Sequence, residues 1–356
     1  MSLLQSILSK MARYSTAWIL AWALLVGAIV LNMAASGVLV DIYTYFCINL
    51  MLVLGLQVFM GNSGILNWTY VGFVGIGAYA SSILSTSHAV KEMAVANMYP
   101  GLVELQTPII PALIIGGLVA AAVAAAIAWP LMRLSNAVGV ITLFATLIVI
   151  HVLMTQWDNV TNGPRKFFGV EYYTTVFIAA GAAAATLLAA YYFRESSLGL
   201  RVRASRDDRF AAMAVGVSVI GVRYYTFILS SFVAGLGGGI WAHYITSFSP
   251  KSFYMAEAFV LITMLVIGGA GSISGATVGA VIVTVMRESL RQVEGFLNNS
   301  GVIDFQVYGL TELTVAILMI VILIWRPEGI IGGQELRLPF AGAKRRAVEG
   351  SDETSS

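Results

Sequence analysis

The sequence holds little of the chemistry that binds metals or forms disulfides. Cys47 is the only cysteine among 356 residues, which excludes a disulfide within the chain and a cysteine-rich metal site. The three histidines, His88, His151 and His243, lie far apart and lack the i, i+4 spacing of a helical zinc pair. We therefore expect no metal site in this chain.

Charge is also scarce. Charged residues make up 11% of the chain and the formal net charge is +2, which is too small for a nucleic-acid-binding surface. Hydrophobic residues make up 58%, and the mean hydropathy is +0.85. These values are typical of a polytopic protein surrounded by membrane lipid, not of a soluble two-domain protein.

Apolar stretches recur at the length of a membrane helix, which is about 20 residues for a hydrocarbon core of about 30 Å. We predict an all-α bundle of about ten spans, at residues 18–33, 43–60, 65–84, 109–131, 138–154, 174–193, 224–244, 256–267, 277–290 and 308–325. The first fits a signal peptide as well, but its length favours a retained helix. The eighth and ninth are short, and one broken helix is the alternative.

The basic residues indicate which ends of the spans face the cytoplasm. If the amino end is cytoplasmic, fourteen Lys and Arg residues fall in cytoplasmic segments and five in external ones. By the positive-inside rule, both termini are predicted to be cytoplasmic in an inner or plasma membrane. A transmembrane domain then covers residues 1–334, and the small, polar residues 335–356 form a disordered cytoplasmic tail.

One long charged passage, residues 194–223, interrupts the membrane pattern and carries six of the twenty Lys and Arg residues. Within it, residues 203–216 predict a short amphipathic helix with Phe210 and Met213 near one face. Such a helix suits docking into a cleft of another protein. An ordinary cytoplasmic loop that obeys the positive-inside rule is the alternative.

The sequence also predicts where this helix begins and ends. Ser205 or Asp207 is expected to cap its start, and Asp208 suits the positive end of the helix dipole. Gly216 is expected to stop it.

Glycine interrupts the helical pattern at two further places, residues 61–67 and 268–276. In the predicted topology both breaks follow a span that runs toward the cytoplasm, as expected if two halves of the chain are related repeats. Broken helices expose backbone groups at membrane depth, which is tolerated where they are buried in protein or line a cavity.

Several of these segments resemble one family. The SLGLR segment at residues 197–201, then Arg206, Asp207, Asp208, Ala211, Ala212 and Gly216, resemble the cytoplasmic coupling loop of branched-chain amino acid ABC transporter permeases. The chain is more similar still to the M-type member of the paired permeases. The match extends to residues 72–79, 234–238 and 268–275 and covers most of the chain from about residue 61 to residue 280.

The resemblance implies a permease without an ATPase site of its own. It implies a second, similar permease, two cytosolic ATP-binding subunits and an extracytoplasmic solute-binding protein as partners. The residues that it assigns to ATPase coupling are Arg203, Arg206, Asp207, Asp208, Ala211, Ala212 and Gly216. The chain has no G-x-x-x-x-G-K-[ST] motif, so we expect no cofactor here and ATP on the partners only.

A path for a zwitterion needs small and uncharged polar side chains. The candidates are Asn67, Thr69, Tyr70, Tyr79 and Ser81 near the third span, Thr142, Thr146 and His151 on the fifth, and Asn162 and Gly163 in an outer turn. Polar residues in membrane helices more often bond neighbouring helices. The segments at residues 67–69 and 165–169 depart from the family pattern, so branched-chain amino acids, other amino acids, urea and short amides all stay open as substrates.

Two rival functions make different predictions. A rhomboid-like intramembrane serine protease would bring Ser63 to within about 3 Å of His243, yet the predicted topology puts them at opposite faces. An ion-coupled secondary transporter needs a carboxylate near the middle of the bilayer. The acidic residues of the spans lie near span ends instead, at Asp41, Glu257, Glu288 and Glu312.

Overall fold

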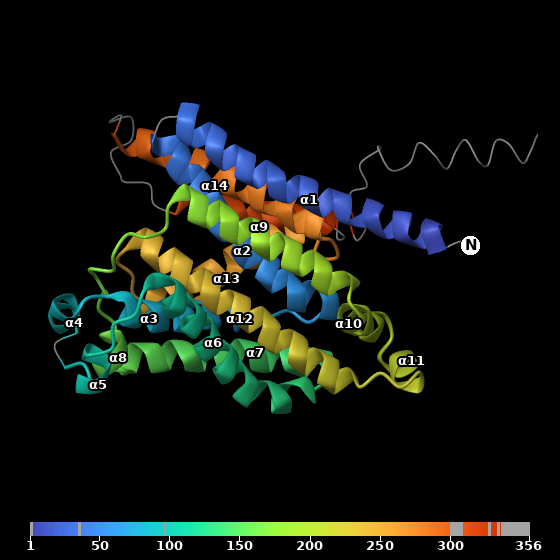
Figure 1. Cartoon of the computed structure of the whole chain (residues 1–356), viewed down its shortest axis with the longest axis horizontal. Coiled ribbons are helices and arrows are strands. Elements are labelled where there is room, and N and C mark those ends of the chain that lie inside the picture. The colour runs from blue at the N-terminus through green and yellow to red at the C-terminus, as the bar shows by residue number, and fades with distance from the viewer. Residues whose placement is uncertain are drawn as a thin grey trace, which may run out of the picture.

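The computed structural model describes residues 3–34, 37–95, 97–299, 309–326, 329–332 and 335, and these residues form helices without strands (Figure 1). One isolated antiparallel bridge joins Phe167 to Phe248. The all-α prediction is confirmed. The predicted tail lies outside the described residues except for Glu335.

Eight helices of the described chain have the length and hydropathy of a membrane span. They are α1 (Leu3–Ala34), α2 (Gly37–Leu56) continued by η1 (Gln57–Gly61), α6 (Ile109–Met132), α7 (Asn136–Gln156), α9 (Val176–Glu195), α12 (Val219–Ile245), α13 (Met255–Gly268) together with the preceding η2 (Pro250–Phe253), and α14 (Ile273–Asn299). Shorter apolar helices are α3 (Tyr70–Ser85) and α15 (Leu310–Trp325). Each predicted span therefore coincides with a helix. The crossing of the bilayer by ten of them stays a prediction, as does the side of each terminus.

The two glycine breaks change the predicted boundaries. The third helix begins at Tyr70 and not at residue 65, because Gly64 has a φ of 71° and residues 64–67 are not helical. At the second break α13 ends at Gly268, and Gly269 has a φ of 115°. Residues with a side chain rarely adopt such positive φ angles, so the helical backbone is interrupted at Gly64 and at Gly269. The eighth and ninth predicted spans are thus two separate helices.

Small residues let the central helices approach closely. α12 lies against α3 and α6, and a Cβ at Gly77 would overlap the backbone of Gly235. A Cβ at Gly238 would likewise overlap the Val74 carbonyl group on α3. This is the usual basis of tight packing between membrane helices. α2 packs against α9, α12, α13 and α14, so it connects the two sides of the bundle.

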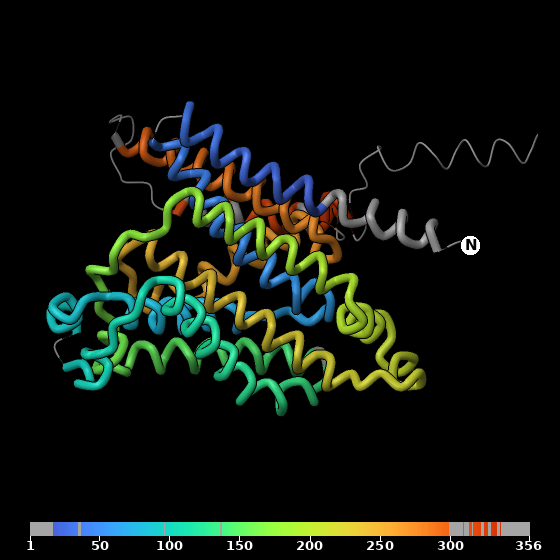
Figure 2. Tube along the Cα trace, in the orientation of Figure 1, coloured from blue at the N-terminus to red at the C-terminus, as the bar shows by residue number. Residues whose placement is uncertain are grey.

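The connecting segments gather at two opposite ends of the bundle (Figures 1 and 2). One end carries the short helices α10 (Ser197–Asp207) and α11 (Arg209–Ala214), and we name it the α10–α11 end. The other carries α4 (His88–Ala94), α5 (Pro100–Val103), α8 (Asp158–Thr161) and η2 (Pro250–Phe253), and we name it the α4–α5 end.

Candidate functional site: a docking helix and two glycine breaks

The charged loop is two helices and not one. Asp208 is extended, with φ −148° and ψ 115°, and its Oδ1 accepts hydrogen bonds from the backbone N–H groups of Phe210 at 2.8 Å and Ala211 at 3.0 Å. The prediction of a single helix over residues 203–216, capped by Ser205 or Asp207, is therefore wrong. Asp208 is the cap, because its carboxylate satisfies the free N–H groups that start α11.

Gly216 ends α11 as predicted. Its φ is 83°, its N–H donates to the Met213 carbonyl at 3.0 Å, and the Val217 N–H donates to the Ala212 carbonyl at 3.0 Å. These two bonds form the Schellman pattern of a glycine-terminated helix.

α11 presents apolar side chains to its surroundings. The exposed fraction is 79% for Phe210, 78% for Val215 and 43% for Met213. Ala212, also predicted for coupling, is buried at 3% and faces the protein. Exposed apolar groups on a polar loop are typical of a surface that another protein covers.

Arginines fasten α10 to three different helices. Arg203 donates to the Arg194 carbonyl at the end of α9 (3.0 Å), and Arg223 of α12 donates to the Ser205 carbonyl (3.2 Å). Arg206 donates from Nη1 to the Gly61 carbonyl at 2.6 Å, across 145 positions of sequence. The predicted coupling residue Asp207 is exposed.

The two glycine breaks meet at the α10–α11 end. A Cβ at Gly61 would overlap the Ala270 carbonyl oxygen, so the turn after η1 lies directly against the turn between α13 and α14. Thr69 closes the first break by donating its hydroxyl to the Leu143 carbonyl on α7 at 2.5 Å. Most residues of both breaks are buried, Gly64 being exposed, which is the first of the two arrangements expected for broken helices. The relation of the two halves as repeats stays a prediction.

Residues 329–332 and Glu335 bond to the second break, and we name them the strap. The Ile330 N–H donates to the Ile267 carbonyl at 2.9 Å, and the Ser272 hydroxyl donates to the Gly332 carbonyl at 3.1 Å. The Glu335 carboxylate accepts from the Ile273 and Ser274 N–H groups at the start of α14 and pairs with Arg194. An anion at a helix start and a cation at a helix end both suit the helix dipoles.

The predicted path residues do not come together in one place. Asn67 and Thr69 lie in the first break, and Asn162 and Gly163 form a turn at the α4–α5 end with φ values of 65° and 59°. Thr142 and Thr146 donate their hydroxyls to carbonyls four residues back in α7, at 2.8 Å each. Asn67 and Tyr79 are buried, and their side-chain polar atoms have no hydrogen-bond partner in the described part of the chain.

Tyr79 belongs to an aromatic cluster at the α4–α5 end. Its ring centroid lies 5.0 Å from that of Phe248, 6.1 Å from Phe167 and 6.2 Å from Phe253, all edge to face. Phe167 follows the predicted outer turn and is fully buried. The cluster therefore joins the segment after that turn to Tyr79 of α3.

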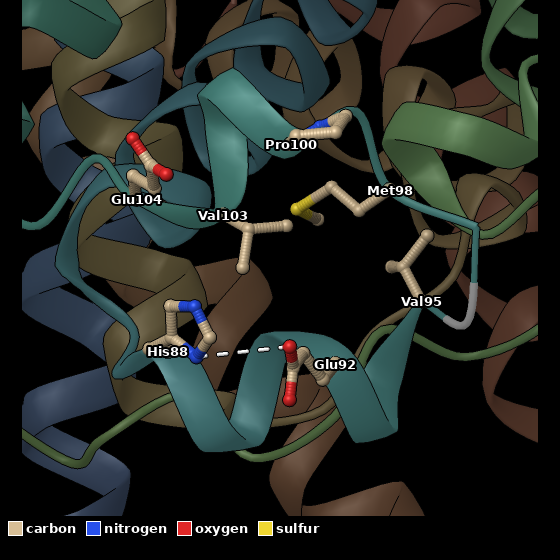
Figure 3. Close-up of a pocket in the computed structure, with 7 residues that line it drawn as sticks. All are labelled: His88, Glu92, Val95, Met98, Pro100, Val103 and Glu104. Atoms are coloured by element: carbon tan, nitrogen blue, oxygen red, sulfur yellow. Dashed lines mark ion pairs between the residues drawn. The ribbon is translucent and has the colours of Figure 1, made fainter.

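The α4–α5 end also carries a small cleft, about 240 Å³ in volume (Figure 3). Its lining combines the apolar Val95, Met98, Pro100 and Val103 with His88, Glu92 and Glu104. Behind it the fully buried Lys91 donates to the carbonyls of Leu102 (3.2 Å), Val103 (3.5 Å) and Leu105. Burial lowers the pKa of Lys91, while the three acceptors hold α4 to α5.

The serine protease dyad is absent from the described residues. Ser63 accepts from the Ile65 N–H in the first break, at 3.2 Å. His243 lies at the far end of α12, with Nδ1 2.7 Å from the Gly239 carbonyl and Nε2 2.7 Å from the Ser85 hydroxyl. Both serines are thus occupied, and Ser85 with His243 ties α3 to α12. Of the acidic residues, Glu257 lies 4.0 Å from Arg287; the side chain of Glu312 lies outside the described set.

Sequence reasoning missed three parts of this site. The bond from Arg206 to Gly61 and the strap by Glu335 join residues far apart in sequence, and no local pattern marks them. The burial of Phe167 was also missed. Its neighbour Phe168 is 45% exposed, as expected for an outer loop.

The fold and the site define a membrane protein of several spans, one end of which presents a short helix with exposed apolar side chains beside two broken helices. Residues 38–325 match the family described as branched-chain amino acid transport system permease components, and the chain belongs to this family.

Individual relatives agree with this assignment. The chain is 28% identical over 343 residues to the high-affinity branched-chain amino acid transport system permease protein LivM of Salmonella typhimurium, which covers 87% of this chain and 73% of the relative. LivM of Escherichia coli gives the same values. LivH of Escherichia coli, a permease protein of the same type of system, is 28% identical over 145 residues, or 40% of this chain and 42% of the relative. No solved structure matches the chain.

Proposed function

We propose that this chain is the permease subunit of an ABC importer that moves branched-chain or related amino acids across the plasma membrane. Membership of the permease family and the likeness to LivM support the amino acid substrate. The chain lacks the phosphate-binding motif of P-loop ATPases, so ATP binds to partner subunits.

The α10–α11 end faces the cytoplasm in this proposal. Most arginines of the described chain gather there, at positions 133, 194, 201, 203, 206, 209 and 223. The α4–α5 end carries Lys91, Arg165, Lys166 and Lys251, and Arg291 on α14 is the fifth basic residue predicted to be external. The excess at the first end supports this orientation through the positive-inside rule.

α11 is the docking helix for two cytosolic ATP-binding subunits, and its exposed apolar face is the observation that carries the proposal. Phe210, Met213 and Val215 would be costly to leave uncovered beside water. An amphipathic helix that enters a groove is a common way for one protein to bind another. The Gly216 stop and the Asp208 cap fix the length of the docked segment.

The α4–α5 end receives the solute from an extracytoplasmic binding protein near residues 162–168. The ring contact between Tyr79 and Phe167, which follows this turn, supports a role for Tyr79 near the point of entry. The predicted path residues of this chain are scattered, which supports a path shared with a second, similar permease.

Transport then needs two states of the helix bundle. ATP binding and hydrolysis on the partners act through α11, and the bundle rocks between outward-open and inward-open forms. Only partners that bind the two forms with different affinity can drive this change.

The test is ATP-dependent uptake by proteoliposomes that contain the whole complex and its binding protein. We expect uptake of labelled leucine, isoleucine and valine above that of urea and acetamide. Preferred uptake of urea or acetamide would assign the short-amide alternative, and absence of any ATP-dependent uptake would contradict the importer.

A further inference from the structure

We propose that Arg206 is a positioning residue that carries the movement of α11 to both glycine breaks. This inference rests on the proposed function and adds to it the route of coupling within the chain. Four observations support it in turn: the short link from α11, the bond to the first break, the contact between the breaks and the strap on the second.

The link from α11 to Arg206 is short. Asp208 alone separates α10 from α11, and its own N–H donates to the Ala204 carbonyl at 3.1 Å. Arg206 stands in the last turn of α10, directly before this joint. A displacement of α11 by a docked partner is therefore transmitted to Arg206 through a single intervening residue.

Arg206 contacts the first break through both its aliphatic carbons and its guanidinium group. The guanidinium Nη1 donates to the Gly61 carbonyl at 2.6 Å, and a Cβ at Gly64 would lie 3.0 Å from the Arg206 Cγ. The final carbonyls of a helix have no partner within it and carry partial negative charge. A cation on the Gly61 carbonyl therefore stabilises the end of η1.

Gly61 passes the movement on by direct contact. The Gln57 side chain folds over Gly61 on one side, and the Ala270 carbonyl lies against it on another. The space leaves no room for a methyl group, so the first break cannot shift toward the second without pushing it.

The second break is held on its far side by the strap. The bonds from Ile330 and Ser272 and the Glu335 carboxylate tie it to the start of α14 and, through Arg194, to the end of α9. α9 leads directly into α10, so Arg206 belongs to a closed ring of contacts that couples both breaks to the docking helix.

The experiment compares Arg206→Ala with Arg201→Ala in the reconstituted complex with its partner permease, ATPases and binding protein. Arg201 lies on the same helix, carries the same charge and is exposed like Arg206, but only Arg206 of the two donates to the Gly61 carbonyl. ATPase binding is measured in both variants, and weaker binding by Arg206→Ala alone would place Arg206 in the docking interface and overturn its positioning role. Transport per ATP hydrolysed should fall by about tenfold in Arg206→Ala only, since a hydrogen bond from a charged group is worth about that factor or more. Arg206→Lys should recover part of the loss, because an ammonium can also donate to the carbonyl.

Amide hydrogen exchange of residues 57–69 provides a readout that does not depend on transport. It should rise in Arg206→Ala and stay at the wild-type rate in Arg201→Ala. Normal coupling in Arg206→Ala, or an equal loss in Arg201→Ala, would overturn the role of Arg206 while leaving the importer intact. A wild-type complex that moves no solute with ATP would overturn the proposed function itself, and this inference with it.

Discussion

The two ends of the molecule are held together in different ways. At the α10–α11 end, long arginine side chains bond the carbonyls of helix ends and glycine turns. At the α4–α5 end, stacked and edge-to-face rings surround Tyr79, and the buried Lys91 fastens α4 to α5. Packed rings resist displacement, whereas hydrogen bonds from long side chains to turns can re-form after a shift. In the proposed importer, movement enters at the α10–α11 end, where the ATP-binding subunits dock.

The largest effect is expected at the exposed face of α11. Phe210→Asp should weaken ATPase binding by about a hundredfold, because an aromatic anchor contributes about 2–4 kcal/mol to an interface. The helix itself should persist, since Phe210 is 79% exposed. Biolayer interferometry with the purified ATPases measures the change. The matched control is Phe296→Asp, 71% exposed near the end of α14. Equal ATPase affinity of Phe210→Asp and Phe296→Asp would mean that the α10–α11 end is not the docking site for the ATPases.

A smaller effect is expected where the two glycine breaks touch. Gly61→Ala should lower the stability of the purified protein by about 2 kcal/mol, because the new methyl group overlaps the Ala270 carbonyl. Gly181→Ala is the control, since α9 has open space at that position. Thermal unfolding in detergent compares the two. If Gly61→Ala melts with the control, the breaks are not in the tight contact described.

Lys91→Met tests whether the buried Lys91 holds α4 to α5 at the α4–α5 end. We expect amide exchange over residues 88–103 to speed up by the equivalent of about 1–3 kcal/mol, because three carbonyls lose their donor. Glu92→Gln should change little, since its carboxylate lies 3.8 Å from His88 at an exposed position. Equal exchange in Lys91→Met and wild type would mean that Lys91 does not fasten this end.

The smallest structural effect is expected for Tyr79→Phe. Its hydroxyl has no partner in the described part of the chain, so stability should change by less than about 0.5 kcal/mol. If the hydroxyl contacts the solute during passage, the KM for uptake should rise by about threefold to tenfold. Thr155→Val is the control, because that hydroxyl bonds its own helix at 2.8 Å. An unchanged KM in Tyr79→Phe would take Tyr79 out of the path.

The spans were predictable from sequence because apolar runs of membrane length seldom occur in proteins that fold in water. Gly216 was predictable as a stop because the required backbone angle is a local property of glycine. The cap was not, since Ser205, Asp207 and Asp208 are all good caps and only packing chooses among them. In the structure Ser205 bonds the Val202 carbonyl instead.

Long-range pairs were beyond the sequence for a different reason. The family resemblance assigns Arg206 to ATPase coupling, but nothing near it in the chain indicates its bond to Gly61. Glu335 lay in a stretch whose composition predicts a disordered tail, yet its carboxylate caps α14. Such contacts depend on how helices distant in sequence are packed.

Site-specific cross-linking tests most directly whether the α10–α11 end is where the ATPases dock. Val215 is 78% exposed on the α11 side and Met93 is 69% exposed on α4, while the single native cysteine, Cys47, is fully buried. A photoreactive maleimide is attached to Val215→Cys or to Met93→Cys in the assembled complex. The account predicts a covalent adduct with the ATP-binding subunit from Val215→Cys alone. An adduct from Met93→Cys, or none from Val215→Cys, would contradict it.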